Sequence, residues 1–385
     1  MLTKEPNVIT ELGLNKLNYS VKEIDGIFNT CNTQLSSIIN NNSCLVVIGE
    51  NVYHIYGSLI YNYFETYLKD KYKIITITDL ENNKNMSTIT YILDEAQKMG
   101  LDRKGIMIGI GGGITMDMVG FASSMYRRKI EYIRIPTTLI GFVDAGIGIK
   151  TGINYHSSKN FIGAFYPPKI CLNDYSFLNT LSVIEIRNGI SEMLKMGIII
   201  DAKLFARIEG NIDDIIVSKC TCKEGRIAIY EAIYDMLREL DKNFYEECLE
   251  RLVDFGHTFS PFIEVSSNYK IPHGHAVTLD MAISCDASYK LGFLSLADRN
   301  KILNVLLKAG LKVYDDETFK STEMANSLKN IILHRGGNLN LVLPSKIGKA
   351  FFYKEDITSE FLNLIFDTLK NYQLNFKYDE SKYCF

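Results

Sequence analysis

The chain has 385 residues, which is enough for two domains with separate hydrophobic cores. Apolar residues make up 46% and charged residues 23%, the proportions of an ordinary globular protein. The net charge of -3 argues against a nucleic-acid partner, so any phosphate site must be built locally.

Neither the cysteines nor the N-terminus indicates secretion or a membrane. The eight cysteines are scattered without a disulfide-like framework. Only Cys220 and Cys222 are close together, and we interpret their spacing as chance rather than as a metal site. The N-terminal sequence MLTKEPNVITELG lacks the apolar core of a signal peptide, and no run reaches the length of a membrane span. We therefore expect a reduced, cytoplasmic protein with no membrane partner.

The N-terminal third predicts an arm followed by alternating strands and helices. Residues 1–43 are polar and asparagine-rich towards their end, which predicts an extension before the first domain strand. Buried strands follow at 45–48 and 73–76. The first turn, Gly49-Glu50-Asn51, is not glycine-rich, unlike that of a usual dinucleotide fold. Asp79 or Glu81, after the second strand, would suit an adenosine ribose hydroxyl, although a solvated loop explains them equally well.

A glycine turn organises the middle of this region. The apolar run 106–110 ends in Gly111, Gly112 and Gly113, and a helical spacing begins at Met116. Glycines here let backbone N–H groups approach a phosphate, and the following helix adds the positive end of its dipole. A pyrophosphate would fit, but GIGGGI lacks the full GxGxxG spacing, so a plain tight turn is the alternative.

Polar residues gather after the next predicted strand, 131–135. Because the surrounding sequence AGIGIKTGI is small and apolar, these residues indicate a site for a polyhydroxylated anion; a flexible surface loop is the alternative. The alternation of strands and helices predicts a parallel sheet covered on both faces. The polar residues are Asp144, Lys150, Asn154, Lys159 and Asn160.

After a last predicted strand at 169–172, the sequence from Asp174 onward is mainly predicted to be helical. Only 340–343 and 349–353 then look like strands, and they form a predicted hairpin. The sequence thus predicts a Rossmann-like α/β domain over 44–180 and a mainly α-helical domain over 181–385. The predicted helices cover 184–200, 223–240, 249–266, 276–290, 296–307 and 320–332.

The predicted helical domain contains a candidate metal site. His257 and His273 are sixteen residues apart on consecutive predicted helices, so they can meet in space. Glu192 lies in an apolar helix, where an unpaired carboxylate is costly to bury. One glutamate with two histidines is a frequent catalytic zinc set, whereas the alternative is that each histidine caps or packs a helix. Lys195 would share a face with Glu192, to meet a substrate anion or form a simple salt bridge.

Six motifs occur in an order that resembles the dehydroquinate synthase superfamily, the sugar phosphate cyclases. They are GGGITMDMVGF, RIPTTLIGFVDAGIGIKTGIN, KNFIGAFYPPK, GISEMLK, DFGHTF and HGHAV. The resemblance extends from about Glu50 to Pro344, most of the chain.

The resemblance implies a cofactor, a metal and a set of substrate residues. Zn²⁺ or Co²⁺ would bind Glu192, His257 and His273, and the catalytic set would add Asp144, Lys150 and Lys195. Asn160 would line the substrate, and Arg128 would reach the phosphate of a neighbouring subunit's substrate in a homodimer. NAD would bind through Asn51, Glu81, Lys84, Gly112, Gly113, Asp117, Thr137, Thr138, Lys159 and Thr180.

Departures from the dehydroquinate synthase pattern narrow the expected substrate. Asp254 replaces an asparagine, and Glu250 stands where an arginine is expected. Two carboxylates there would repel a substrate carboxylate and prefer hydroxyls. Pro261 and His275 depart from the pattern as well. The sequence ERLVDFGHTFSP resembles sedoheptulose 7-phosphate cyclases, above all 2-epi-5-epi-valiolone synthases, with His334 or Arg335 as substitute phosphate ligands.

The predicted activity is therefore cyclisation of sedoheptulose 7-phosphate to 2-epi-5-epi-valiolone, a carbocycle-forming phosphate elimination. By resemblance, it proceeds through transient oxidation by NAD, loss of phosphate, reduction and intramolecular aldol closure. Alternatives are a 3-dehydroquinate synthase and cyclases that make 2-epi-valiolone or desmethyl-4-deoxygadusol. Two further alternatives are an NAD-dependent metal alcohol dehydrogenase and a binding module without catalysis.

Overall fold

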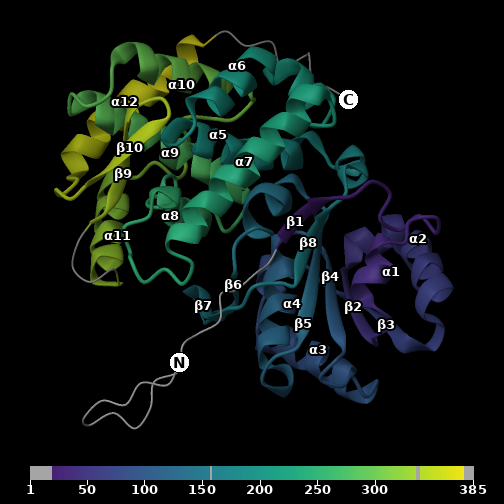
Figure 1. Ribbon diagram of the computed structural model, residues 1–385. Helices are drawn as coiled ribbons and strands as arrows, with labels where there is room; N and C mark the ends of the chain where they lie inside the picture. Colours follow the sequence, from purple (N-terminus) through teal and green to yellow (C-terminus); the bar gives the residue numbers. More distant parts are fainter. Residues whose placement is uncertain (1–19, 157, 335–338, 377–385) are drawn as a thin grey trace, which may run out of the picture.

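The computed structural model describes residues 20–156, 158–334 and 339–376, with the backbone alone for 329–334. A parallel sheet with its helices forms one part, and a larger group of helices lies beside it (Figure 1). This arrangement confirms the predicted fold class. We call the two parts the sheet half and the helical half.

The sheet half is built on a six-stranded parallel sheet of order β1-β8-β5-β4-β2-β3. The central strands β2 and β4 read CLVVIG and IMIGIG and are buried along their whole length. Such continuous apolar runs are typical of parallel strands covered on both faces. The strands are β1 (Ser20–Glu23), β2 (Cys44–Gly49), β3 (Tyr72–Ile77), β4 (Ile106–Gly111), β5 (Glu131–Pro136) and β8 (Ile170–Asn173).

Helices cover both faces of this sheet, and an unpredicted hairpin forms a separate two-stranded sheet beside it. One hydrophobic cluster joins the sheet to α1 and α2, and a second joins it to α3 and α4. The antiparallel hairpin of β6 (Lys150–Tyr155) and β7 (Ser158–Phe165) packs against α4. The helices are α1 (Gln34–Ile39), α2 (Glu50–Leu68), α3 (Met86–Lys98) and α4 (Gly113–Met125).

The expectation that residues 1–43 form only an arm is wrong for the residues described. β1 is an edge strand in register with β8, and α1 buries Leu35 and Ile39 in the core. The sequence hid this because β1, SVKE, is short, polar and mostly exposed, as edge strands often are.

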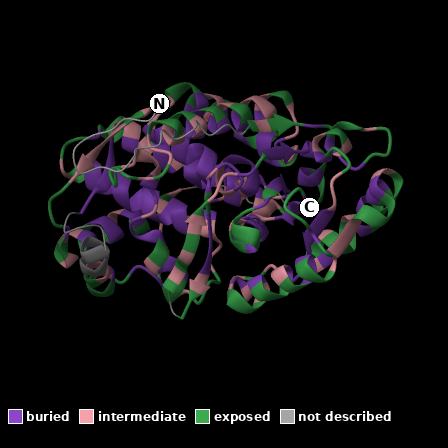
Figure 2. Ribbon diagram, turned by 60° about the horizontal axis from the view of Figure 1, so that its bottom comes forward, coloured by how far each residue is buried: buried purple, intermediate pink, exposed green. Residues whose placement is uncertain are grey.

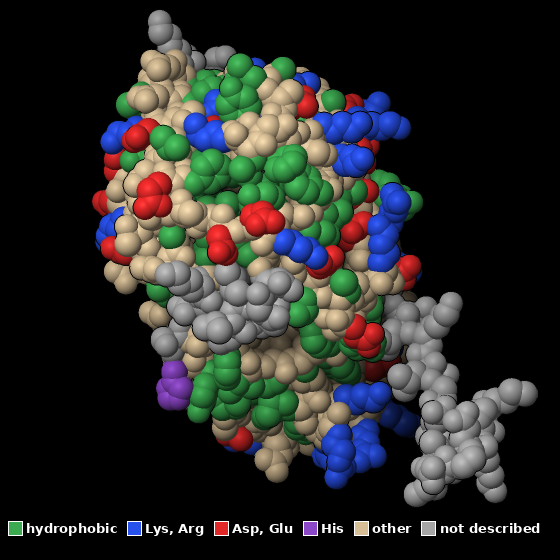
Figure 3. Space-filling model, turned by 90° about the vertical axis from the view of Figure 1, so that its left-hand side faces the viewer, with side chains coloured by type: hydrophobic (Ala, Val, Ile, Leu, Met, Phe, Trp, Pro, Cys, Tyr) green, Lys and Arg blue, Asp and Glu red, His purple; other side chains and the backbone are tan. Residues whose placement is uncertain are grey.

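The helical half has a hydrophobic core separate from the two clusters at the sheet. Buried residues of both halves are purple in Figure 2. The hairpin of β9 (Leu341–Lys346) and β10 (Lys349–Tyr353) confirms the predicted pair of strands. In the described part of the chain, no helix is long and apolar enough to cross a membrane. On the face shown in Figure 3, acidic and basic side chains lie among one another with hydrophobic ones between them. The helices are α5 (Val183–Ile199), α6 (Ala202–Val217), α7 (Lys223–Lys242), α8 (Ser260–Ser266), α9 (His273–Lys290), α10 (Leu296–Lys308), α11 (Ser321–His334) and α12 (Ser359–Asn375).

The predicted helix over 249–266 is mostly absent. That stretch contains the short 3₁₀ turn Leu252–Asp254, a loop, and α8, only seven residues long. Gly256 has a φ of +77°, which a helix cannot accommodate and which favours glycine. His257 therefore lies on a loop, while His273 opens α9.

A buried carboxylate fastens the N-terminal segment to the sheet. Asp174, only 2% exposed, accepts hydrogen bonds from the backbone N–H groups of Ile27 (2.7 Å) and Ser176 (2.9 Å). The bond to Ile27 joins residues 147 positions apart in the chain. The carboxylate thus satisfies two backbone donors that would otherwise be buried without partners.

We predict that Asp174→Ala lowers the free energy of unfolding by about 2 kcal/mol, because both N–H groups lose their acceptor. Urea unfolding followed by circular dichroism would measure the change. The matched control is Asp70→Ala, because Asp70 is exposed; its effect should stay within about 0.5 kcal/mol. Equal effects of the two substitutions would contradict the assignment.

Candidate active site

One cavity of about 770 Å³ lies between the carboxyl ends of the parallel strands and the helical half. Residues that follow β2, β3, β4 and β5 form one wall, and α5 with the loop before α8 forms the other. Ligands of open α/β sheets bind outside the carboxyl ends of the strands, so this is the expected place for a cofactor.

The glycine turn forms the phosphate-sized part of this wall. Gly112 and Gly113 line the cavity, and α4 begins at Gly113. A Cβ on the preceding Gly111 would come within 2.5 Å of Thr115 Oγ1, so the turn is too tight for a side chain there. Open backbone N–H groups and the positive end of α4 make this turn suited to a pyrophosphate.

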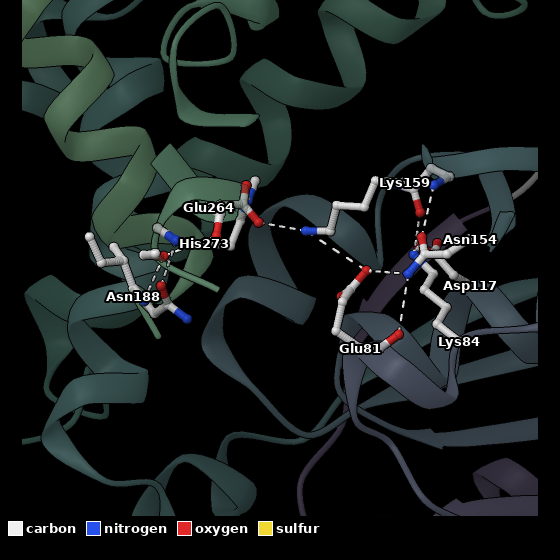
Figure 4. A network of polar contacts seen from close by, with 12 residues as sticks. Glu81, Lys84, Asp117, Asn154, Lys159, Asn188, Glu264 and His273 are labelled. Atoms are coloured by element: carbon white, nitrogen blue, oxygen red, sulfur yellow. Dashed lines mark hydrogen bonds and ion pairs between the residues drawn. The ribbon is translucent and has the colours of Figure 1, made fainter. Parts of the chain in front are cut away.

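We call the wall formed by the residues that follow β2, β3, β4 and β5 the cofactor wall, and a network of polar side chains extends it (Figure 4). Lys84 is 4% exposed, and its Nζ lies 2.5 Å from Asp117 Oδ2 and also contacts Asn160 Oδ1. Asn154 Nδ2 donates to Glu81 Oε1 at 2.8 Å. The wall has both hydrogen-bond donors and acceptors, which the hydroxyl groups of a ribose need. Because its charges are paired, binding a ribose there would not bury an unpaired charge.

The predicted metal ligands converge on one point. One donor atom each of Glu192, His257 and His273 lies within 4.8 Å of the others. Glu192 is 1% exposed; its Oε2 lies 2.6 Å from Lys195 Nζ, and its Oε1 lies 3.5 Å from His273 Nε2. A buried carboxylate with unused acceptor positions beside two imidazoles fits a divalent metal such as zinc.

The charges around this point favour an ionised Glu192. Burial alone would raise the pKa of its carboxyl, but Lys195 and the two histidines hold that pKa below its ordinary value. Burial and the nearby Lys195 lower the pKa of His257, which keeps a neutral imidazole available. Lys195 Nζ also lies 3.7 Å from Asp144 Oδ1. Asp144 is held by a π-helical turn, Gly141–Ala145.

Glu264 orients one metal ligand and connects it to the cofactor wall. Its Oε1 lies 2.9 Å from His273 Nδ1, and its Oε2 lies 2.5 Å from Lys159 Nζ. Lys159 in turn lies 3.8 Å from Glu81 Oε1, so the contacts cross the cavity from one half to the other (Figure 4). Burial would raise the pKa of Glu264, yet His273 and Lys159 lower it to about 2. A carboxylate on the far nitrogen of a metal-binding imidazole fixes its tautomer and orientation.

Asp280 holds the loop that carries His257. This carboxylate of α9 is fully buried, and its Oδ2 accepts from the backbone N–H of Ser260 at 2.9 Å and from that of Phe259. His257 Nδ1 lies 3.1 Å from the carbonyl oxygen of Phe255. Since His273 is the first residue of the same helix, α9 positions both histidines.

The prediction that Glu250 and Asp254 present two bare carboxylates is wrong. Glu250 points away from the cavity and pairs with Lys354 at 2.6 Å. Asp254 does line the cavity, but it pairs with Arg251, which also pairs with Glu246. The cavity therefore contains the guanidinium of Arg251, whereas the sequence had led us to expect the carboxylate of the preceding residue, Glu250.

The other predicted residues divide into three groups. Arg128 is exposed in a turn outside the cavity, so within one chain it contacts no part of it. Arg335 is outside the described residues, and only the helical backbone of His334 is described. The third group consists of candidates that line the cavity, with Asn154 joined to it through its hydrogen bond to Glu81: Asn51, Asp79, Glu81, Lys84, Gly112, Gly113, Asp117, Thr137, Thr138, Asp144, Lys150, Lys159, Asn160, Thr180, Lys195 and Asp254.

Sequence reasoning missed Glu264, Glu246 and Arg251, although all three line the cavity. Glu264 was visible as an acidic residue in the apolar segment FIEV, where its burial called for a partner. Glu246 and Arg251 lie in a polar stretch that resembles a surface loop, and only the fold shows where it lies.

Comparison with known proteins assigns the family. The 3-dehydroquinate synthase N-terminal model matches residues 74–188, and the C-terminal model matches residues 189–331. The chain belongs to the 3-dehydroquinate synthase family. It is thus one of the sugar phosphate cyclases, as its motifs predicted.

Three relatives place it within that family. A 2-epi-5-epi-valiolone synthase of Streptomyces glaucescens is 38% identical over 354 residues, 91% of each chain. A 3-dehydroquinate synthase of Campylobacter jejuni is 38% identical over 308 residues, 78% of this chain and 85% of its own. The solved 2-epi-5-epi-valiolone synthase of Streptomyces hygroscopicus, with NAD⁺ and Zn²⁺ bound, superposes with a TM-score of 0.89 at 33% identity, covering 94% of this chain and 99% of that one.

We predict that Glu264→Gln weakens zinc binding by about 10- to 100-fold, because the amide cannot orient His273 as a carboxylate does. His257→Ala should abolish stoichiometric binding, since it removes a ligand. Competition with a chromophoric chelator would measure both affinities. His54→Ala is the control because His54 is exposed on α2; a loss of zinc there equal to that in His257→Ala would contradict the site.

Proposed function

We propose that this protein is a sugar phosphate cyclase that converts sedoheptulose 7-phosphate to 2-epi-5-epi-valiolone and releases phosphate. The observation that carries the proposal is one cavity lined both by a glycine turn suited to a pyrophosphate and by His257 and His273, which form a three-residue metal cluster with the buried Glu192. The relatives named 2-epi-5-epi-valiolone synthase supply the particular reaction.

The cavity has the groups that such a reaction needs. When bound, NAD⁺ would accept and return a hydride, and zinc or cobalt would polarise the oxygen at the oxidised carbon. Lys195, buried beside Glu192 and Asp144, supports negative charge on a substrate oxygen. Lys150 and Asp144 line the same cavity, so we assign them to hydroxyl positioning and proton transfer.

The sheet-half wall of the cavity has residues that would hold NAD. Gly112 and Gly113 would hold the pyrophosphate, with Thr137 and Thr138 beside them. Glu81 and Asn154, already joined by a hydrogen bond, would contact a ribose. Thr180 accepts or donates a 2.8 Å hydrogen bond with Tyr56, which places a hydroxyl pair at the rim of the cavity.

Several further properties belong to this proposal. We propose a cytoplasmic homodimer in which Arg128 reaches the partner's substrate phosphate. We also propose that residues 44–180 and 181–385 act as cofactor and catalytic domains, with β1 and α1 added to the former. His334 and Arg335 are proposed as further phosphate ligands.

A 3-dehydroquinate synthase is the second candidate, because the Campylobacter jejuni enzyme of that name has the same 38% identity over a shorter match. The two activities differ in whether the seven-carbon substrate carries a carboxylate, so they can be separated directly.

We predict that the purified protein with NAD⁺ and Zn²⁺ releases phosphate from sedoheptulose 7-phosphate without accumulating NADH, since a cyclase returns its hydride. A coupled phosphate assay and absorbance at the NADH band would be read together, and product NMR would identify the ring. Accumulating NADH would indicate a dehydrogenase instead. Turnover of the carboxylated substrate alone would indicate the second candidate.

We also predict that dialysis against a chelator abolishes phosphate release and that added Zn²⁺ or Co²⁺ restores it. The metal is expected to bind ligands that the fold already holds in place, so circular dichroism should change little. Phosphate release that survives complete metal removal, checked by elemental analysis, would contradict a metal-dependent reaction.

A further inference from the structure

A cluster of four charged groups lies at the helical wall of the cavity. Glu246 Oε1 is 2.6 Å from Lys150 Nζ and also accepts from Arg251. The second branch of the Arg251 guanidinium donates to Asp254 Oδ1. We call Lys150, Glu246, Arg251 and Asp254 the neutral cluster, because two cations face two carboxylates and the formal charges cancel.

The loop that presents Glu246 is fastened at both ends. Asn243, the C-cap of α7, donates through Nδ2 to the carbonyl of Cys248 at 2.6 Å and accepts from its N–H at 3.1 Å. Glu250 is joined to Lys354 near the end of β10. Between them Glu246 has a φ of +55° and turns its carboxylate inward, so that its side chain is 14% exposed whereas Glu247 is an exposed residue.

The neutral cluster adjoins the metal site. The carbonyl oxygen of Asp254 accepts a 2.9 Å hydrogen bond from the backbone N–H of His257. Burial alone would lower the pKa of Lys195, but Glu192, Asp144 and, to a smaller extent, the Asp254 carboxylate raise it above its ordinary value. A substrate that reaches the metal therefore places its neighbouring atoms against this cluster.

The chemistry of the cluster discriminates between two kinds of substrate. Lysine and arginine only donate hydrogen bonds, and carboxylates only accept them, whereas a hydroxyl can do both. A polyol can therefore satisfy all four groups at once. A substrate carboxylate accepts only, and to reach Arg251 it must displace or oppose Glu246 or Asp254.

We propose that Glu246 is a specificity-determining residue: together with Asp254 it neutralises Lys150 and Arg251, and so it selects a sugar phosphate with a hydroxylated head over one with a carboxylate. This inference rests on the proposed function and deepens it. It assigns the selectivity to Glu246 and its two cations, not to the pair of carboxylates that the sequence had suggested.

The test compares Glu246→Gln with the wild type on two phosphates. The first is sedoheptulose 7-phosphate, and the second is a seven-carbon 2-keto acid 7-phosphate. Without the Glu246 charge the cluster carries a net positive charge, so the ratio of kcat/KM for the first to that for the second should fall by about tenfold or more. In calorimetry, the variant should also bind the keto acid phosphate about tenfold more tightly than the wild type does.

Two further variants separate charge from shape. Glu246→Asp keeps the carboxylate, so it should retain most of the wild-type preference even if overall turnover falls. Glu247→Gln removes the neighbouring exposed carboxylate and should leave the ratio unchanged. A thermal melt of each variant would show that it is folded.

The outcomes distinguish this inference from the proposed function. If the wild type releases no phosphate from sedoheptulose 7-phosphate, the proposed function fails, and the binding preferences measured by calorimetry still test the cluster. If a folded Glu246→Gln variant keeps the wild-type preference in both turnover and binding, Glu246 does not determine specificity. A shift of equal size in Glu247→Gln would overturn the inference as well.

Discussion

The site depends on the burial of one ionised carboxylate. Glu192 lies in the middle of α5 among apolar residues, and only a strong local positive charge can keep it ionised there. Lys195, one turn further on, provides part of that charge at 2.6 Å. A bound divalent ion would provide the rest, because both carboxylate oxygens still have acceptor positions free of hydrogen bonds among the described residues. The pair of buried charges is thus costly for stability and useful for binding a metal.

A chain of paired charges also crosses the cavity from the metal ligands to the cofactor wall. Glu264 serves His273 on one side and Lys159 on the other, and Lys159 approaches Glu81 on the cofactor wall. A displacement of the hairpin that carries Lys159 would therefore disturb the orientation of a metal ligand. This gives a physical route by which the cofactor and metal sites depend on each other, although they belong to different halves of the fold. The hairpin of β6 and β7 is the element that connects them.

The sequence predicted the regular parts of the structure and the residues with unusual surroundings. Buried strands such as β2 and β4 are legible because continuous apolar runs leave few alternatives. Glu192, His257 and His273 were legible because each polar group stood in an apolar or glycine-rich context. β1 was missed because it is short, polar and mostly exposed, and the β6–β7 hairpin was missed because its many polar residues and glycines hid the apolar pattern of a strand.

The error over Glu250 shows why spacing along the chain cannot decide which side chains face a cavity. From the sequence, Glu250 and Asp254 were both expected beside the substrate, because they stand where the dehydroquinate synthase pattern has an arginine and an asparagine. The chain there is a loop that ends in a 3₁₀ turn, in which residues 251 and 254 share a face and residue 250 points outward. Arg251 consequently takes the inward position, and Glu246 comes in from the end of α7 to meet it. The preference for a neutral substrate head can survive this correction, because it depends on the summed charge of the groups that line the cavity and not on which position supplies each of them.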